Sequence, residues 1–446
     1  MKTTLEELAR ALASEERSGR ALVEDCLARA TAPEGEGRCA FITLHADSAR
    51  ARADALDRAR ARGRAPSRWA GIPLSVKDLF DLAGEVTRAG STLLASAEPA
   101  RATAPAIDRL LRAGFVVVGR TNMTEFAYSG VGINPHYGTP RNPFDRATGR
   151  IPGGSSSGAA ISVTDGMAFA GIGTDTGGSC RIPAALTGLV GFKPTASAVP
   201  RDGVYPLSES LDSVGSIASS VACAATLHDV MRGGGGQVPQ ARSPATLRLA
   251  VLEHYVIESL DETVATGYGQ ALERLAAAGA ELTPVRLPAI ETLPELNAGG
   301  GIAAAEAYAF HRRQLAIHES EYDPRVASRI KAGADVTREE LGRIRMARAG
   351  MIEAFARLMD PYDALLAPSV PVIAPPMTAF ETDAEYVRLN LLLLRNPSLF
   401  NFLDGCAISI PVHEPGSAPV GLMLAAPGGR DRALLAVAAG AGTVFP

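Results

Sequence analysis

The chain has 446 residues, of which 46% are hydrophobic and 21% are charged, a composition typical of globular proteins. Its 44 basic and 48 acidic residues give a formal net charge of -4 without a long run of one sign, which argues against a nucleic-acid-binding face. The five cysteines are scattered and have no CxxC spacing, which argues against a disulfide framework or a zinc site and favours a reducing compartment.

The first 65 residues are predicted to form a helical outer layer. Thr4 and Glu7 have the spacing of a capping box, and 46–62 is a polar stretch rich in alanine and arginine. The start, MKTTLEELAR, has no apolar signal-peptide core, and no segment approaches the ~20 apolar residues that a membrane span needs. We therefore expect a cytoplasmic protein without a membrane segment.

From residue 71 onward, short apolar runs alternate with Gly-rich turns and helical segments. These runs lie at 72–76, 115–118, 167–172 and 189–192. Alternation of this kind favours a sheet with helices packed on it.

A Gly-rich connector at 233–236 separates this part from the rest of the chain. Beyond it the pattern predicts two strands, one helix and a long helical block, at 247–252, 281–285, 261–278 and 302–359 respectively. Two more apolar segments, at 407–412 and 420–425, precede a closing helix from Arg430, and we expect them to rejoin the main sheet.

Two clusters of glycine and serine carry the clearest chemical signal. PGGSSSGAA begins at Pro152 and GTDTGGSCRIP at Gly173, so that Ser155 and Ser179 lie 24 residues apart. Paired glycines let a substrate approach the main chain and let neighbouring amides point at one developing negative charge. That is what an oxyanion hole requires, although either cluster alone is equally typical of an ordinary loop.

A serine nucleophile needs a base, and a lysine is the best candidate here. The seven histidines are scattered and none has a turn-rich motif of its own, whereas Lys77 follows the apolar segment GIPLSV in a chain with only four lysines. Burial lowers the pKa of an amine and lets it accept a proton, which an arginine cannot do. The alternative is an ion pair of Lys77 with Asp78 or Asp81.

Together these segments resemble the amidase signature family. The resemblance covers about 71–219 and is carried, in order, by GIPLSVKDLF, GRTNMTEFA, TPRNPFD, GGSSSG, GTDTGGSCRIP and GFKPT, with weaker matches in AISIPV and PVGLML. It implies an α/β fold with a central mixed β-sheet flanked by helices on both faces. It also implies one amidase domain over 1–446, with the outer layer at 1–65, a signature core at 71–220, a variable helical lid at 288–386 and a return to the sheet at 396–446.

The family's catalytic set carries over to this sequence residue by residue. Ser179 matches the nucleophile, Lys77 matches the base, and Ser155 matches the bridging serine, whose preceding peptide bond is cis in the family. By the same resemblance, the oxyanion is held by backbone amides of Thr176, Gly177 and Gly178, with that of Ser179.

Other positions match supporting residues of the family. Ser156, Asp175 and Arg181 match polar positions that hydrogen-bond around the triad, and Tyr128 and Ser129 match a region that lines the acyl pocket. The sequence departs from common family residues without removing a catalytic atom, at Ser157, Ala159 and Cys180.

The resemblance implies an amidohydrolase that cleaves a small-molecule amide, carbamate or urea-like C–N bond through a serine acyl-enzyme, a urethanase activity included. No metal or other cofactor is expected, and the expected partner is the small-molecule substrate, with no nucleic acid and no membrane; a homodimer is compatible with the sequence. One alternative is the amidase subunit of a glutamine-dependent tRNA amidotransferase complex, and another is a catalytically silent scaffold on the same fold.

Two short motifs offer other serine chemistries. Residues 154–158 fit the GxSxG elbow of α/β-hydrolases, which would make Ser156 the nucleophile with His413 downstream. Ser328 and Lys331 fit the SxxK motif of penicillin-recognising enzymes, but no SDN or KTG partner accompanies them. Neither motif assigns a catalytic role to Lys77 or to the GTDTGGS segment.

Overall fold

The computed structural model describes residues 3–446, which form one 11-stranded sheet and the helices packed around it. The strands are β1 (Phe41–Leu44), β2 (Pro73–Lys77), β3 (Val116–Thr121), β4 (Ala170–Thr174), β5 (Val190–Lys193), β6 (Val214–Ala218), β7 (Arg248–Leu252), β8 (Glu281–Val285), β9 (Ala364–Pro368), β10 (Cys406–Pro411) and β11 (Gly421–Ala426). The α-helices are α1 (Leu5–Ala13), α2 (Gly19–Ala30), α3 (Gly37–Ala40), α4 (Ala46–Ala61), α5 (Pro105–Arg112), α6 (Ser157–Thr164), α7 (Arg181–Thr187), α8 (Val221–Met231), α9 (Glu262–Ala277), α10 (Leu293–Leu296), α11 (Gly301–His318), α12 (Pro324–Lys331), α13 (Arg338–Leu358), α14 (Asp383–Phe402) and α15 (Asp431–Ala441).

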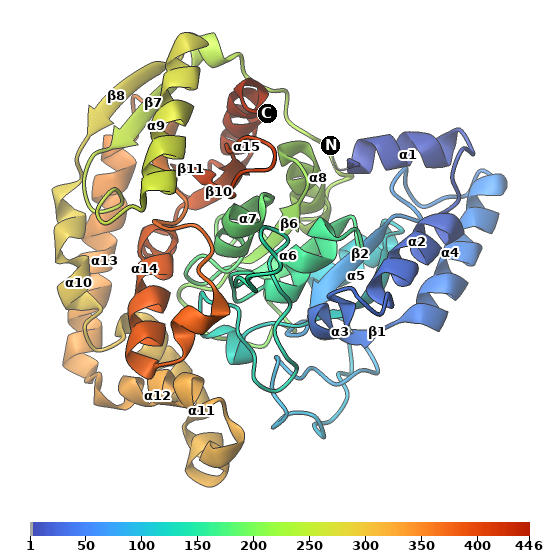
Figure 1. Ribbon diagram of the computed structural model, residues 1–446, viewed down its shortest axis with the longest axis horizontal. Helices are drawn as coiled ribbons and strands as arrows, with labels where there is room; N and C mark the ends of the chain where they lie inside the picture. Colours follow the sequence, from blue (N-terminus) through green and yellow to red (C-terminus); the bar gives the residue numbers. More distant parts are fainter. Residues whose placement is uncertain (1–2) are drawn as a thin grey trace.

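The sheet is mixed, as predicted, and its strand order is β1-β3-β2-β4-β6-β5-β10-β11-β9-β7-β8. β2 runs parallel to β3 and β4, whereas β10 runs antiparallel to β5 and β11. The β5–β10 pairing joins the signature segment directly to the C-terminal segment. In Figure 1, α1, α2 and α4 lie at one end of the molecule, and α10 and α13 lie at the other.

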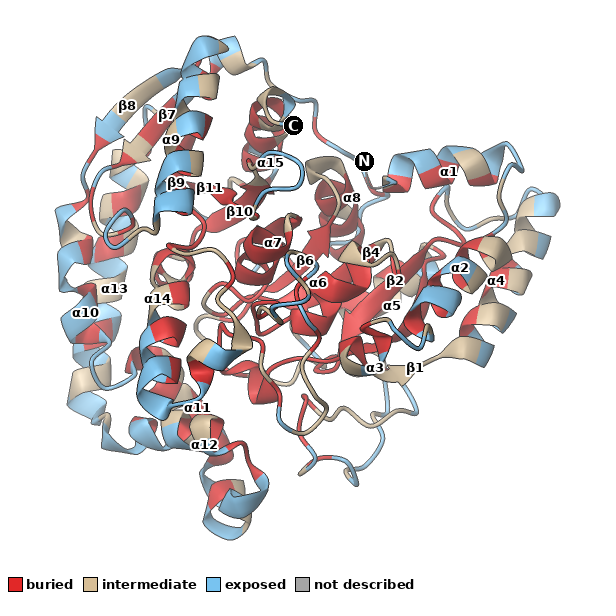
Figure 2. Cartoon of the chain, in the orientation of Figure 1, coloured by how far each residue is buried: buried red, intermediate tan, exposed pale blue. Residues whose placement is uncertain are grey.

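Helices cover both faces of the sheet, which confirms the second part of the predicted fold. Along β11, Leu422 and Leu424 pack into a core with α9 and α15, while Met423 and Ala425 pack into a core with α13 and α14. Successive side chains of a strand point to opposite faces, so a strand buried on both faces reads as one apolar run. Figure 2 shows this burial concentrated in the central strands and in α6 and α7.

The N-terminal segment contains the predicted helices and one strand that the pattern did not reveal. Thr4 and Glu7 form the predicted capping box at the start of α1, and α4 matches the polar stretch. β1 adds a four-residue edge strand beside β3. This strand lies between helices in a stretch predicted to be helical, and it is held by pairing with β3.

Further along, the strands expected at 72–76, 115–118, 167–172, 189–192, 247–252, 281–285, 407–412 and 420–425 are present with small shifts of their ends. The helical block at 302–359 divides into α11, α12 and α13, because Pro324 starts one helix and Thr337 caps the next. β6 and β9 were not predicted. The assignment of 1–446 to a single domain with a lid at 288–386 stays a prediction.

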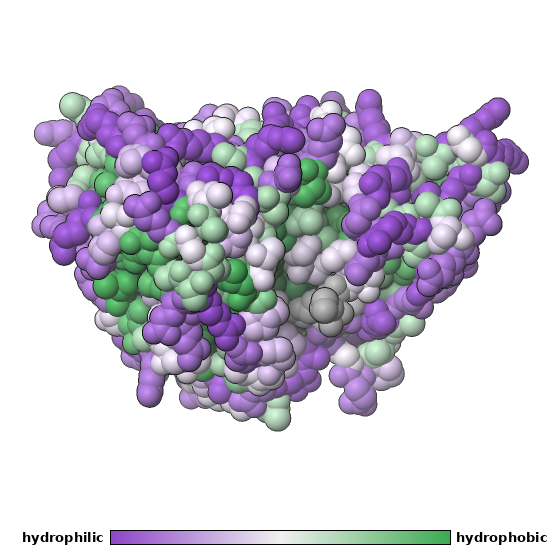
Figure 3. All heavy atoms as spheres, turned by 90° about the horizontal axis from the view of Figure 1, so that it is seen from above, coloured by the Kyte–Doolittle hydropathy of each residue, from purple (hydrophilic) through white to green (hydrophobic). Residues whose placement is uncertain are grey.

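The face of the molecule in Figure 3 is largely hydrophilic, with apolar residues exposed in smaller groups between the hydrophilic ones. Ile317 on α11 and Met346 on α13 are the most exposed of the large apolar side chains between residues 3 and 446. None of the helices formed by these residues has the length and apolar character needed to cross a bilayer.

Candidate active site

Strand ends at the centre of the sheet bring the candidate residues together. Lys77 is the last residue of β2 and Thr174 is the last of β4, and these strands are parallel neighbours, so both lie at the same edge of the sheet. β6 runs antiparallel to β4 and pairs Val214 with Thr174, which places the preceding Asp212 and Ser213 at that edge too.

Lys77 is fully buried and has two hydroxyl partners. Its Nζ lies 2.7 Å from Ser155 Oγ and 2.9 Å from Thr174 Oγ1. Burial lowers the pKa of Lys77 to about 8, because the ammonium form loses its hydration. The alternative pairing with Asp78 is not formed, since the Asp78 carboxylate accepts a hydrogen bond from Arg120 at 2.6 Å.

Ser155 is held on a segment that hydrogen-bonds to the loop after β3. The peptide bond between Gly154 and Ser155 is cis. Gly154 N–H donates to the Gly130 carbonyl at 2.8 Å, and the Ser155 carbonyl accepts from Thr124 N–H at 3.1 Å. Hydrogen bonds on the preceding residue and on its own carbonyl therefore hold the backbone of Ser155, the partner of Lys77, in place.

Ser179 lies next to this segment and is 3% exposed. Its carbonyl accepts a hydrogen bond from Ser156 N–H at 3.3 Å. Within residues 3–446, no hydrogen bond joins the hydroxyl of Ser179 to that of Ser155. The structure thus places Lys77 and Ser155 in direct contact, and it connects Ser179 to them through the backbone of Ser156.

Asp175 organises the loop that precedes Ser179. Its carboxylate accepts from the N–H groups of Gly178 at 2.8 Å and Cys180 at 3.2 Å, and Arg181 donates to both of its oxygens. Burial opposes ionisation of Asp175, but the Arg181 guanidinium outweighs burial and lowers the pKa to about 2. Asn401 of α14 completes the network by donating to Asp175 and accepting from Arg181. These contacts hold the loop before Ser179 in place, and the supporting role of Asp175 and Arg181 in catalysis stays a prediction.

The predicted set of oxyanion donors needs one correction. The Gly178 N–H is directed at Asp175, so it is not free to hold an oxyanion. The N–H groups of Thr176, Gly177 and Ser179 have no acceptor in the part of the chain that the structure describes. These three amides remain as candidate donors, while Gly178 supplies the backbone conformation, with φ at +124°.

The remaining predicted residues lie around this centre. Ser156 Oγ donates to the Thr174 carbonyl at 3.4 Å, and its supporting role stays a prediction. Ser129 Oγ donates to Asn390 and accepts from the Tyr386 hydroxyl, both on α14. Tyr128 is buried beneath Arg329, whose guanidinium lies 4.3 Å from its ring centre.

The SxxK match does not form a site. Lys331 is about half exposed and pairs with Glu319 at 2.6 Å. Ser328 lies exposed on α12, and within residues 3–446 no hydrogen bond joins its hydroxyl to that amine.

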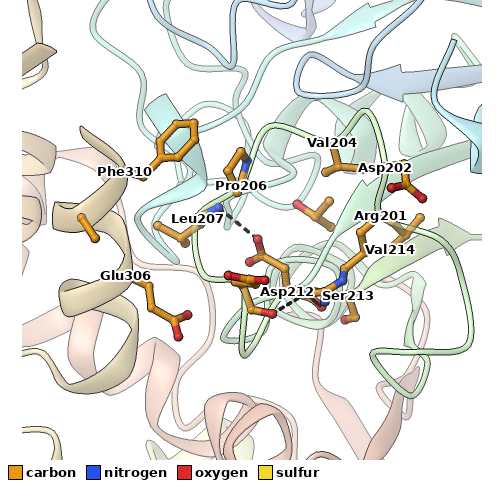
Figure 4. A pocket seen from close by; sticks show the side chains of 13 residues that line it. Arg201, Asp202, Val204, Pro206, Leu207, Asp212, Ser213, Val214, Glu306 and Phe310 are labelled. Atoms are coloured by element: carbon orange, nitrogen blue, oxygen red, sulfur yellow. Dashed lines mark hydrogen bonds between the residues drawn. The ribbon is translucent and has the colours of Figure 1, made fainter. Parts of the chain in front are cut away.

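A cavity of about 660 Å³ is lined by Thr174, a hydrogen-bond partner of Lys77, whereas Lys77, Ser155 and Ser179 do not line it. Figure 4 shows Phe310 and Glu306 of α11 on one side of it and Asp212, Ser213 and Val214 on the other. The remaining lining is supplied by Arg201, Asp202, Val204, Pro206, Leu207, Glu209 and Ala309. Among residues 3–446, no three His, Cys, Asp or Glu side chains converge as they would around a metal ion.

Sequence reasoning missed four residues of this environment. Thr174 lies within the GTDTGGSCRIP motif, at the end of an expected strand, so its position was a usable signal. Asp212 precedes β6, which the sequence did not reveal, so no comparable signal pointed to it. Asn401 and Arg329 lie on helices with no local motif, so only the tertiary structure reveals their contacts.

Comparison with known proteins gives a consistent result. A sequence model of the Amidase family matches residues 21–435. The chain is 35% identical to 2-amino-5-chloromuconic acid deaminase of Comamonas testosteroni over 90% of this chain and 87% of the relative. It is 33% identical to the 1-carboxybiuret hydrolase subunit AtzE of Pseudomonas sp. (strain ADP), over 96% of this chain and 94% of the relative. A crystal structure of an amidase superposes with a TM-score of 0.89, 31% identity and full coverage of both chains.

Proposed function

We propose, from the premise that the chain belongs to the amidase signature family of hydrolases acting on carbon–nitrogen bonds, that it cleaves small-molecule amides through an acyl-enzyme on Ser179. The observation that carries this proposal is the 2.7 Å contact between a buried Lys77 Nζ and Ser155 Oγ. With a pKa of about 8, an appreciable part of Lys77 is neutral near pH 7 and able to accept a proton.

The proposed reaction moves one proton along the triad. Neutral Lys77 takes a proton from Ser155, Ser155 takes one from Ser179, and Ser179 Oγ forms a bond to the substrate carbonyl carbon. The carbonyl oxygen becomes an oxyanion, which the free amides of Thr176, Gly177 and Ser179 stabilise. Proton return to the leaving nitrogen breaks the C–N bond, and water then repeats the sequence to release the acid. Carbamates and urea-like substrates fit the same steps.

The environment of Tyr128 supports a substrate that carries a carboxylate. Arg329 donates to the Tyr128 carbonyl at 2.7 Å and stacks on its ring, and no carboxylate in residues 3–446 forms an ion pair with it. Arg325, one turn earlier on α12, also stacks on a tyrosine, Tyr386, yet it pairs with Asp383 at 2.9 Å. Arg329 therefore stacks on a tyrosine as Arg325 does, but it has no carboxylate partner among residues 3–446.

Arg329 is connected through hydrogen bonds to the segment that carries Ser155. Tyr128 lies two residues before Gly130. The Gly130 carbonyl accepts a hydrogen bond from the N–H of Gly154, which is the residue before Ser155. A guanidinium presents paired N–H groups that match a carboxylate, and charge-assisted bonds of this kind are among the strongest. The two relatives described above are named for substrates with acid groups, which supports the same substrate class.

The test is hydrolysis by the purified chain of paired chromogenic amides: the 4-nitroanilide of succinic acid and its methyl ester, with a carbamate and a primary amide alongside. We expect turnover that Ser179→Ala abolishes, and a preference for the free acid. Arg329→Gln should raise KM for the acid by about 10- to 100-fold and leave the ester unchanged. Arg325→Gln is the matched control and should keep the acid-to-ester ratio.

Failure has two separable forms. No turnover of any substrate by the chain alone contradicts the proposed hydrolase and favours the partner-dependent amidotransferase subunit. Turnover of the ester that equals turnover of the acid, in both the wild type and Arg329→Gln, contradicts only the carboxylate assignment.

A further inference from the structure

We propose that Glu306 is a positioning residue for the oxyanion hole: it holds 208–212 against α11, and through Asp212 it holds Thr176. This inference rests on the proposed function, since it concerns the same reaction. Glu306 lies on α11, in the part of the chain where the sequence shows no match to the family motifs.

Glu306 is tied to the 208–210 turn by three hydrogen bonds. It accepts from Ser208 Oγ at 2.6 Å, from Ser210 N–H at 2.9 Å and from Ser210 Oγ at 2.5 Å. Its side chain is 15% exposed, and Arg345 on α13 lies 3.3 Å away. A largely buried carboxylate with this many donors holds the turn in one position.

The same turn continues to the oxyanion loop. Ser208, whose hydroxyl is held by Glu306, donates its own N–H to Asp212 Oδ2 at 3.1 Å, and Leu207 N–H donates to the same oxygen. The other oxygen, Asp212 Oδ1, accepts from the Thr176 hydroxyl. The path from Glu306 to Thr176 therefore consists of three hydrogen bonds, which the covalent structures of Ser208 and Asp212 join.

The hydrogen-bonded path from Glu306 ends on Thr176, whose backbone N–H has no acceptor among the described residues. Thr176 N–H is one of the three remaining candidate donors to the oxyanion, and such donors act only when they lie at about 2.7 to 3.1 Å from the developing charge. Because the Thr176 side chain is anchored by Asp212, a shift of 208–212 moves the Thr176 backbone as well. Glu306 acts on the transition state more than on the bound substrate.

The first experiment compares Glu306→Ala with Asp363→Ala. Asp363 is a matched control, because its side chain is also 15% exposed and also accepts hydrogen bonds from an arginine and a backbone N–H. It differs in its location, since it directly precedes β9 and bonds to the first residue of β7. We expect Glu306→Ala to lower kcat by about 10- to 100-fold with KM changed less than threefold, and Asp363→Ala to leave both constants unchanged. Glu306→Gln, which keeps an acceptor oxygen, should recover part of kcat.

The second experiment tests the path itself. Thr176→Val removes the hydroxyl and keeps the backbone N–H, so Glu306→Ala should cost little further kcat in a Thr176→Val background. Full additivity of the two losses overturns the proposal, and so does an equal effect of Glu306→Ala and Asp363→Ala on kcat.

A readout independent of turnover separates this inference from the proposed function. In two-dimensional amide NMR spectra, Glu306→Ala should shift the signals of Thr176 and Gly177, and Asp363→Ala should not. Unshifted Thr176 and Gly177 signals in Glu306→Ala overturn the inference even where the wild type hydrolyses amides. Shifted signals support it even where no amide of the panel is turned over.

Discussion

Lys77 Nζ and Ser155 Oγ lie 2.7 Å apart, and both side chains are completely buried. A lysine in this position has lost its water shell, and its two side-chain partners are hydroxyl groups instead of carboxylates. The result is an amine whose pKa falls to about 8. Such an amine changes its protonation state within a pH range where the protein can be assayed.

The pH dependence of activity follows from this pair. Since neutral Lys77 is the proposed base, kcat/KM should rise with pH to a midpoint near 8 and level off above it. Lys77→Ala should lower kcat/KM by about a thousandfold or more at every pH while the fold remains intact. Steady-state kinetics between pH 6 and 10 and circular dichroism of the variant measure both effects.

Lys193 is the control for this prediction. It is also fully buried, and burial lowers its pKa to about 8, but its Nζ donates to the carbonyls of Pro194 and Gly405. Lys193→Met should reduce stability without moving the midpoint of the pH–rate profile. A flat profile in the wild type, or a midpoint that moves in Lys193→Met, would contradict the role given to Lys77.

The Asp175–Arg181 pair should dominate the stability of the loop before Ser179. Both side chains are completely buried, so Asp175→Asn leaves a buried guanidinium without its counter-charge, and we expect a loss of about 3 to 5 kcal/mol in the free energy of unfolding at pH 7. Urea denaturation measures this loss. The exposed pair of Glu353 and Arg357 is the control, and Glu353→Gln should change stability by less than about 0.5 kcal/mol.

The same pair predicts a pH dependence of stability. Because folding lowers the pKa of Asp175 from 3.8 to about 2, its ionised form contributes stability above about pH 4 and loses that contribution as the pH falls toward 2. The stability difference between wild type and Asp175→Asn should therefore shrink over this range. A difference that stays constant down to pH 2 would show that the charge of Asp175 is not the source.

Gly178 should tolerate no side chain. Its φ is +124°, and a Cβ there would lie 2.6 Å from Pro397 Cγ, so Gly178→Ala must displace the loop or α14. Gly429 has φ at +86° with open space around it, so Gly429→Ala isolates the conformational cost of roughly 1 to 2 kcal/mol. We expect a larger loss of stability in Gly178→Ala and at least a tenfold lower kcat, measured by thermal unfolding and kinetics. Equal behaviour of the two variants would contradict a close contact at Gly178.

Local sequence determined much of the architecture. Apolar runs of four to six residues predicted most strands, because a strand buried on both faces must be apolar throughout, and Thr4 with Glu7 predicted the start of the first helix. Lys77 and the two Gly/Ser clusters could be singled out because their residue types are unusual at those places. The sequence did not predict β1, β6 and β9, although they are no shorter than β5, and their pairing with neighbouring strands reveals them in the structure.

Only the tertiary structure decided which backbone groups are free and which distant residues meet. The sequence offered four neighbouring amides as oxyanion donors, and folding commits that of Gly178 to Asp175 because the chain turns back on that carboxylate. Arg329 reaches Tyr128 from 201 residues away, and Glu306 reaches Ser208 from 98 residues away. Contacts of this kind depend on how helices pack onto the sheet, and no local pattern of residues records them.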